Sequence, residues 1–255
     1  MLSSILIIFA STGAALLFLV AVTRIWPHHA RKESNDFTGA VVAVIGTTYA
    51  VILAFTLSGV WNNFQEAQAN EEQEANALTN VYRIATTLQD PNAQRIQELC
   101  ARYAENAVNR EWPQMKADEI PPAADEITDQ LWQLAGQVQA HATPDAIAAY
   151  QLMEELRGLT QYRRLRLVQA RERLPVLLWS VLIAGGIITV AAACFFGVSD
   201  FRFHLLQVLM LSFLISLVLF AIADIDRPYQ GLVTVAPQGF ESAVQKLQHR
   251  PDGLK

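Results

Sequence analysis

The chain has 255 residues, 52% of them hydrophobic, and a formal net charge of −5 at pH 7. This acidic balance, without a basic stripe of interleaved aromatic residues, excludes nucleic acid as a partner. Cys100 lies in a polar segment and Cys194 in an apolar one, so we expect no disulfide between them. No His/Cys spacing typical of a zinc site is present in the sequence, so no metal site is predicted on that basis.

Four apolar runs dominate the sequence, two near each end. They cover residues 4–26, 38–61, 175–198 and 203–223. Each is close to the ~20 residues that a helix needs to cross ~30 Å of hydrocarbon. The first lacks the basic start and the cleavage site of a signal peptide, so we expect a retained helix. The sequence therefore predicts an integral membrane protein in which 1–61 holds membrane helices 1 and 2 and 175–223 holds membrane helices 3 and 4. Between and after them we expect a cytosolic helical domain, 62–174, and a cytosolic tail, 224–255.

Lysine and arginine near the ends of the runs predict the orientation in the membrane, because cytoplasmic loops carry an excess of them. One side carries four, namely Arg24, Arg31, Lys32 and Arg202. The other side carries seven, namely Arg157, Arg163, Arg164, Arg166, Arg171, Arg173 and Arg227. Both termini and the large middle domain are thus expected in the cytoplasm.

The second apolar run has two distinct stripes at helical spacing. Small side chains recur every four residues and would let another helix approach closely: Gly46, Ala50, Ala54 and Ser58. The other stripe is hydrophobic in the middle of the membrane and becomes polar and then acidic: Val44, Thr48, Ile52, Phe55, Gly59, Asn62 and Glu66. Rings of Ile52 and Phe55 around a symmetry axis would form a narrow constriction that gates by dewetting. The alternative is that this stripe faces lipid, which Ile and Phe suit equally well.

The middle domain has its apolar residues at helical intervals and no alternation of period two. We expect the second membrane helix to continue to Asp90-Pro91 as one rod of roughly 75 Å. A second helix is expected to face inward through Ile96, Leu99, Cys100, Tyr103 and Ala107 and to end before Pro113. A third follows Pro121-Pro122, and a fourth starts at Thr143-Pro144-Asp145 and runs to Pro175. The predicted fold is all-α: four transmembrane helices and a cytosolic bundle formed by extensions of helices 2 and 3 plus two shorter helices.

Charge is unevenly distributed in this domain. Acidic residues gather early, at Glu66, Glu71, Glu72 and Glu74, whereas arginines gather late, near the third membrane helix. One interpretation is solvated helix faces, with the arginines facing lipid headgroups. In the other, the acids line a vestibule or bind a cation.

The segment after the fourth run contains Asp224 and Asp226 at the end of a helix, where the helix dipole disfavours anions. Arg227 is the nearest partner in sequence, and Pro228 then ends the helix. The three residues are interpreted either as a salt-bridged turn or as a candidate cation or gating site. Two Asp residues supply too few oxygens for Ca²⁺ by themselves. Further on, Phe240, Val244 and Leu247 predict a short amphipathic helix.

Two motifs carry a resemblance to a known family. One is Asp226-Arg-Pro-Tyr-Gln-Gly231, followed by Val235, Pro237 and Phe240; the other is Trp61-Asn-Asn-Phe-Gln-Glu-Ala with Leu78-x-x-Val-Tyr-Arg83. With the four apolar runs, they make nearly the whole chain resemble the bacterial bestrophin-like membrane proteins, a family of unknown function. The resemblance to bestrophins proper implies a pentameric anion channel whose second helix lines the pore, with Ile52 and Phe55 at the constriction. It also implies a Ca²⁺ site at Asp224 and Asp226, although this chain is shorter and lacks a dense acidic run after the last helix.

The leading hypothesis is a homo-oligomeric ion channel of the bacterial inner membrane, with chloride-type anions favoured. A cation channel stays open, because Glu66 and the acids beyond it would attract cations if they faced the axis. The other alternative is a non-conducting scaffold or sensor that binds a protein partner through its cytosolic domain. No nucleophile–base constellation or phosphate loop is visible, so we expect no enzyme. The expected partners are the lipid bilayer, further copies of the chain and small inorganic ions, and Ca²⁺ is the one candidate cofactor.

Overall fold

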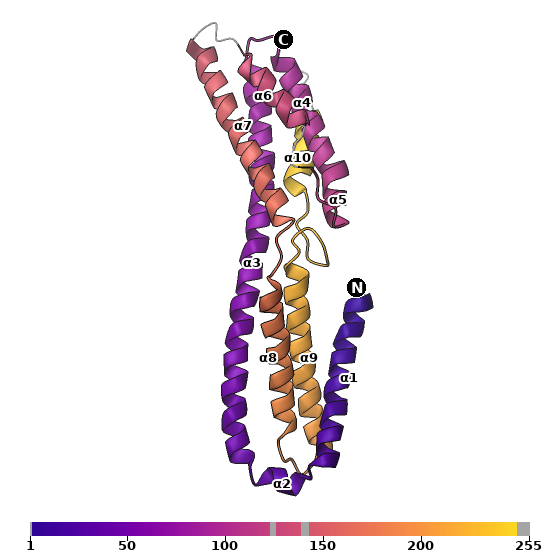
Figure 1. The fold of residues 1–255 in the computed structure, drawn as a ribbon. Coiled ribbons are helices and arrows are strands. Elements are labelled where there is room, and N and C mark those ends of the chain that lie inside the picture. The colour runs from indigo at the N-terminus through magenta and orange to yellow at the C-terminus, as the bar shows by residue number, and fades with distance from the viewer. Residues whose placement is uncertain (1, 123–125, 139–142, 249–255) are drawn as a thin grey trace. The chain divides into compact units, whose positions relative to one another are not determined.

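A computed structural model describes residues 2–122, 126–138 and 143–248. All regular structure in these ranges is helical, without a strand, which confirms the predicted all-α class. Four helices are long and apolar enough to cross a membrane, as the four apolar runs predicted (Figure 1). They are α1 (Leu2–Ile25), α3 (Asn35–Thr87), α8 (Val176–Cys194) and α9 (Phe201–Ile225). The others are α2 (His28–Lys32), α4 (Ala93–Asn106), the π-helical turn η1 (Ala107–Glu111), α5 (Trp112–Lys116), α6 (Glu126–Gly136), α7 (Thr143–Gln169) and α10 (Gln238–Gln248).

The chain forms two compact units. The first, here called the membrane unit, comprises Met1–Asn62 and Arg173–Asp226. The second, here called the extramembrane unit, comprises Asn63–Glu172 and Arg227–Lys255. Helix α3 has 53 residues and contributes to both units, as expected for a second membrane helix that continues without a break.

The membrane unit is held together by apolar contacts among its long helices. Leu19 of α1 packs with Cys194 and Val208 in one buried cluster. In a second cluster, Val60 of α3 packs with Leu182 of α8 and Ile222 of α9. Tyr49 joins α3 to α8 at a pair of glycines: a Cβ added to Gly185 would lie 2.5 Å from the Tyr49 ring, so only glycine fits there. The Tyr49 hydroxyl donates to the Leu182 carbonyl at 2.9 Å, which satisfies this buried polar group.

The turn between α8 and α9 is fixed by α2 and the first residue of α3. Asn35 exchanges two hydrogen bonds with Gly197: its Nδ2 donates to the Gly197 carbonyl at 3.1 Å, and its Oδ1 accepts from the Gly197 N–H at 2.9 Å. A Cβ at Gly197 would lie 2.3 Å from the backbone nitrogen of Lys32. The backbone of α2 therefore approaches this turn more closely than any residue other than glycine would allow.

Two helix ends differ from the prediction. The helix that starts with α4 was expected to end before Pro113, but it continues through the π turn and α5 to Lys116. A proline lacks the N–H of the regular helix and clashes with the preceding turn, and the wider π turn before Pro113 accommodates both defects. The fourth helix of this domain was expected to reach Pro175, but α7 ends at Gln169 and α8 starts at Val176. Pro175 disfavours the helical conformation of Leu174, directly before it, so α7 and α8 cannot be one continuous helix.

The predicted amphipathic tail helix is confirmed as α10, whose buried residues are Phe240, Ala243 and Leu247. In the same unit, α6 packs on α7 and on α4. Trp132 of α6 donates its indole N–H to the Thr160 hydroxyl of α7 at 3.0 Å. Both cysteines are free and buried, Cys100 within α4 and Cys194 at the end of α8.

Candidate functional site

The membrane stretch of α3 has one covered face and two uncovered faces. The covered face consists of Tyr49, Thr56 and Val60, with Leu53 half-buried between them. At about 100° per residue, the stripe of small residues lies roughly 110° to one side of the covered face. The predicted pore stripe lies at a similar angle on the other side. Apart from Ile52 and Gly46, which are half-buried, both stripes lie away from the surface through which α3 packs on its own chain.

The predicted pore stripe is mostly exposed, meaning that the rest of the chain leaves it uncovered. Phe55 is 76% exposed and Val44 is 67% exposed. Thr48, Gly59, Asn62 and Glu66 are exposed as well. Ile52 differs, because it is half-buried and packs against the cluster that contains Val60 and Leu182. Of the two residues predicted to form a constriction, Phe55 is the one that projects freely.

The predicted helix-packing stripe is also uncovered. Ala50, Ala54 and Ser58 are exposed and Gly46 is half-buried. A Cβ added to Gly46 would meet no atom within 4 Å. The stripe therefore has no partner helix among the described parts of the chain, and its role as a packing surface stays a prediction.

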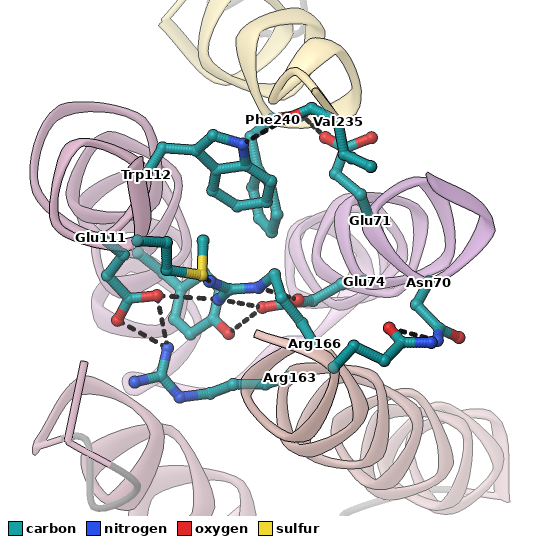
Figure 2. A network of polar contacts seen from close by, with 12 residues as sticks. Asn70, Glu71, Glu74, Glu111, Trp112, Arg163, Arg166, Val235 and Phe240 are labelled. Carbon is teal, nitrogen blue, oxygen red and sulfur yellow. Dashed lines mark hydrogen bonds and ion pairs between the residues drawn. The ribbon is translucent and has the colours of Figure 1, made fainter. Parts of the chain in front are cut away.

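The extramembrane unit contains a buried cluster of four charged side chains, here called the charge cluster: Glu74 of α3, Glu111 of the π turn, and Arg163 and Arg166 of α7. Figure 2 shows the Arg166 guanidinium between the two carboxylates. Its Nε and Nη2 donate to the two oxygens of Glu74 at 2.7 and 2.8 Å, and Nη2 also donates to Glu111 at 2.8 Å. Arg163 Nη1 donates to both oxygens of Glu111 at 2.7 and 2.8 Å.

Aromatic residues close off the charge cluster from water. The Tyr103 hydroxyl donates to Glu74 at 2.6 Å. The centre of the Arg166 guanidinium lies 4.8 Å from the centroid of the Trp112 ring, a cation–π distance. The Arg166 and Glu74 side chains are fully buried, and those of Arg163 and Glu111 are 5% exposed. Two acids and two bases balance in charge, so the cluster is a neutral, dry network.

Opposite charges face each other in the cluster and favour the ionised forms of Glu111 and Arg166. Burial alone would raise the pKa of Glu111, but the neighbouring Arg166 and Arg163 outweigh burial and hold this pKa below its ordinary value. Burial would likewise lower the pKa of Arg166, but Glu74 and then Glu111 raise it well above its ordinary value. The depressed pKa of Glu111 gives stability at pH values above the ordinary carboxyl range, and this stability is lost as the pH falls through the lowered pKa.

A second carboxylate of α3 holds the start of the tail helix. Glu71 Oε1 accepts the N–H of Phe240 at 3.1 Å, in the first turn of α10 (Figure 2). Carboxylates suit this position because the first N–H groups of a helix lack partners within it. The approach is close: a Cβ at Gly239 would lie 2.9 Å from the Ala75 Cβ and 3.0 Å from Glu71 Oε1. The glycine of the tail motif thus brings the tail helix onto α3.

Glu71 itself is 1% exposed and, unlike Glu74, has no arginine partner among the interactions that the structure shows. Burial raises its pKa to about 7, with smaller contributions from Glu74 and Glu72, while the N–H groups of Phe240 and Gly239 act in the opposite direction. The protonation of this one buried group therefore changes near neutral pH.

We expect Glu71→Gln to flatten the pH dependence of the stability of the extramembrane unit. The folded state holds a proton that the unfolded state releases between about pH 4.5 and 7, so stability falls with rising pH across this window by at most about 1.4 kcal/mol per pH unit. Glutamine is neutral, yet its Oε1 can still accept from Phe240. Unfolding midpoints from pH 5 to 8, followed by tryptophan fluorescence, should slope downward in the parent and stay level in the variant. Glu72→Gln, at the exposed neighbour, should keep the parental slope.

The charge cluster corrects one interpretation of the sequence. That interpretation put the acids on solvated faces and the arginines near headgroups. Glu66 and Glu72 are exposed, but four of these residues are buried, namely Glu71, Glu74, Arg163 and Arg166. The sequence does contain a signal: Ala67, Glu71, Glu74, Leu78 and Val81 follow one core stripe of α3 at alternating spacings of four and three. On α7, Leu152, Leu156, Leu159, Arg163 and Arg166 follow another. Charged residues at core positions of an apolar stripe indicate buried ion pairs.

The residues after α9 have separate environments. Both Asp226 carboxylate oxygens accept the N–H of Leu174, at 3.0 and 3.2 Å, just before α8 begins. Asp224 is half-buried, whereas Arg227 is exposed. Asp226 therefore connects the end of α9 to the start of α8.

The side chains of Asp224, Asp226 and Arg227 fit a calcium ion poorly. Ca²⁺ takes 6–8 oxygen ligands, and the Asp226 oxygens already accept a backbone N–H. Within the described residues, no three His, Cys, Asp or Glu side chains gather in a way that could hold a metal ion. A gating or cation site at Asp224, Asp226 and Arg227 stays a prediction.

The fold and these sites define a multi-pass, all-helical membrane protein with a charge-clustered extramembrane unit. The sequence matches the model of the bestrophin-like domain over residues 9–240. The chain belongs to the bestrophin-like family, as its motifs predicted.

Solved structures agree on the fold. The chain is similar to a crystal structure of a bacterial bestrophin homologue from Klebsiella pneumoniae, with a TM-score of 0.68 and 13% sequence identity, over 94% of this chain and 96% of that one. It is also similar to a single-residue variant of the Klebsiella pneumoniae homologue, with a TM-score of 0.72 and 12% identity, over 94% and 99% of the two chains. No curated protein sequence matches this one.

Proposed function

We propose that the chain forms a homo-oligomeric ion channel, with α3 of each copy lining a central pore. The observation that carries the proposal is the uncovered state of α3. Of the residues from Asn35 to Trp61, only Tyr49, Thr56 and Val60 are buried. A membrane helix that also exposes Thr48, Gly59 and Asn62 suits contact with further copies and with water better than contact with lipid alone.

The two uncovered stripes of α3 have separate roles in this proposal. The stripe of Gly46, Ala50, Ala54 and Ser58 allows a neighbouring copy to approach closely. The pore stripe runs from Val44 and Thr48 past Ile52 and Phe55 to Gly59, Asn62 and Glu66. Phe55 forms the main constriction, since Ile52 is partly packed within its own chain. Family membership supports a channel, and five copies is the number that the bestrophins suggest.

Anions are the proposed permeant species, by similarity to bestrophins. Glu66 is exposed near one end of the pore stripe and favours cations, so the opposite selectivity is the competing outcome. The proposed location is the bacterial inner membrane, with both termini and the extramembrane unit in the cytoplasm, as the distribution of lysine and arginine favours. In this proposal the chain is not an enzyme.

Phe55→Ala tests the pore. Removal of the ring should widen a hydrophobic constriction and raise the single-channel current by roughly twofold or more. The measurement is single-channel recording and ion flux with the purified protein in liposomes. The reversal potential in a chloride gradient then gives the sign of the permeant ion.

Phe9→Ala is the matched control, because Phe9 is 67% exposed on α1 and loses the same ring outside the proposed pore. Its current should equal that of the parent. Equal currents from Phe55→Ala and the parent would exclude Phe55 from the constriction. If the folded, oligomeric parent protein gave neither current nor flux, the alternative would be favoured. That alternative is a non-conducting scaffold or sensor that binds a protein partner through its extramembrane unit.

A further inference from the structure

Arg31 is a buried arginine at the end of the membrane unit. It lies on α2 and is 2% exposed. Its Nη1 donates to the carbonyls of Cys194 and Phe196 at 2.9 and 3.1 Å, which closes the C-terminal end of α8. Its Nε and Nη2 are buried too, and they have no hydrogen-bond partner in the described part of the chain.

The contact with α8 does not neutralise Arg31. The carbonyls at a helix C-terminus carry about half an elementary charge, so a full guanidinium charge exceeds what they offset. The nearest acids in sequence, Glu33 and Asp36, are exposed. The Asp200 carboxylate accepts the N–H groups of Arg202 and Phe203. Within residues 2–122, 126–138 and 143–248, no carboxylate forms a salt bridge with Arg31. A buried cation with two unused donors is costly unless an anion reaches it.

A cavity adjoins Arg31. Its volume is about 300 Å³, and it lies between the end of α1, the start of α3 and the end of α8. Trp26, Phe37 and Phe195 give the lining its apolar character, whereas Ser34 and Thr38 add hydroxyl-bearing residues to it. The cavity thus combines one buried positive charge with a largely apolar lining.

We propose that this cavity binds a membrane phospholipid, and that the Arg31 side chain, whose Nε and Nη2 are closed off in the lipid-free protein, turns these two nitrogens toward the phosphodiester. These two nitrogens form one edge of the guanidinium, which matches two oxygens of a phosphate or carboxylate. The protein uses the same edge elsewhere: Arg166 Nε and Nη2 bind both oxygens of Glu74.

The surroundings favour a lipid over free phosphate. The apolar lining offers nothing to an inorganic ion, but it suits the glycerol and the upper acyl chain of a phospholipid. Trp26 ends the first apolar run, where tryptophan is typical of headgroup depth. A phosphodiester at Arg31 would therefore lie at the level of the headgroups of the surrounding leaflet.

The test titrates delipidated full-length protein in detergent with phosphatidylglycerol and counts bound lipids by native mass spectrometry. We expect one tight site per chain, weakened at least tenfold by Arg31→Gln. Lys32→Gln removes the same charge from an exposed side chain of α2 and should leave the site unchanged. Thr38→Phe fills the cavity without touching the bonds from Arg31 to α8, and it should also abolish the site. This variant decides the matter if Arg31→Gln does not fold.

Two further probes identify the chemistry that is bound. Diacylglycerol has the acyl chains without the phosphate, and binding equal to that of phosphatidylglycerol would overturn the role of Arg31. Inorganic phosphate lacks the acyl chains. If it displaced phosphatidylglycerol at a concentration similar to that of the lipid, the cavity would be a small-anion site instead. Retention of phosphatidylglycerol by Thr38→Phe, or equal losses in Lys32→Gln and Arg31→Gln, would refute the cavity as the site.

Discussion

Replacement of Arg166 by methionine is expected to destabilise the extramembrane unit by about 3–5 kcal/mol, because it leaves the buried Glu74 carboxylate without its arginine partner. Glu74 would lose both of its arginine hydrogen bonds and keep only that from Tyr103. The measurement is thermal and chemical unfolding of the full chain in detergent. Hydrogen exchange of peptides from α4 and α7 should locate the loss in this unit.

The matched control is Arg164→Met, on the same helix at an exposed position, which should change stability little. A second control is the double variant Arg166→Met with Glu74→Leu. Apolar residues that replace a whole buried ion pair are often neutral, so it should recover most of the lost stability. A cost below about 1 kcal/mol for Arg166→Met would mean that the pairs behave as exposed ones.

Phe240→Ala is expected to cost about 3–5 kcal/mol, the usual range for a buried Phe-to-Ala change. The ring is fully buried, with its centroid 5.7 Å from that of Trp112 and 6.1 Å from that of Tyr103. Loss of the ring should release α10. The hydrogen bond from the Trp112 indole N–H to the Val235 carbonyl does not involve Phe240 and should remain. Hydrogen exchange in residues 238–248 should rise, and Trp112 fluorescence should shift to the red.

Gln245→Ala serves as the control for Phe240→Ala, since Gln245 is exposed on the same helix. It should leave exchange in the tail as slow as in the parent. Unchanged exchange in Phe240→Ala would show that α10 is held by its polar contacts, chiefly the Glu71 carboxylate, and not by the aromatic ring.

Much of the fold follows from hydropathy alone. Runs of about 20 apolar residues predict membrane helices because the bilayer leaves no other partner for backbone groups. The continuity of α3 followed from the absence of Gly and Pro between Trp61 and Leu88. The path through Pro113 could not be predicted in this way, since a π turn depends on packing around it and not on a local motif.

The charge cluster could not be assigned from single positions. Glu74 and Arg166 are 92 residues apart, and either one alone has the helical spacing of a solvated side chain. Only their place on a core stripe separates them from Glu72 and Arg164, which are exposed. The proposed pore stripe has the reverse problem: it is exposed in the single chain, and its role depends on an arrangement of further copies that the sequence of one chain does not specify.

The burial of both native thiols makes the chain suitable for site-directed labelling. Cys100 and Cys194 are buried and unpaired, and burial raises the pKa of the Cys100 thiol well above its ordinary value. Maleimides and methanethiosulfonates react with thiolates that they can reach. We therefore expect little labelling of the two native cysteines in the folded protein. Single cysteines introduced along α3 would be the only reactive ones, without any need to remove the natural pair. Spin labels or fluorophores placed there would report distances between the copies of this helix in the proposed assembly.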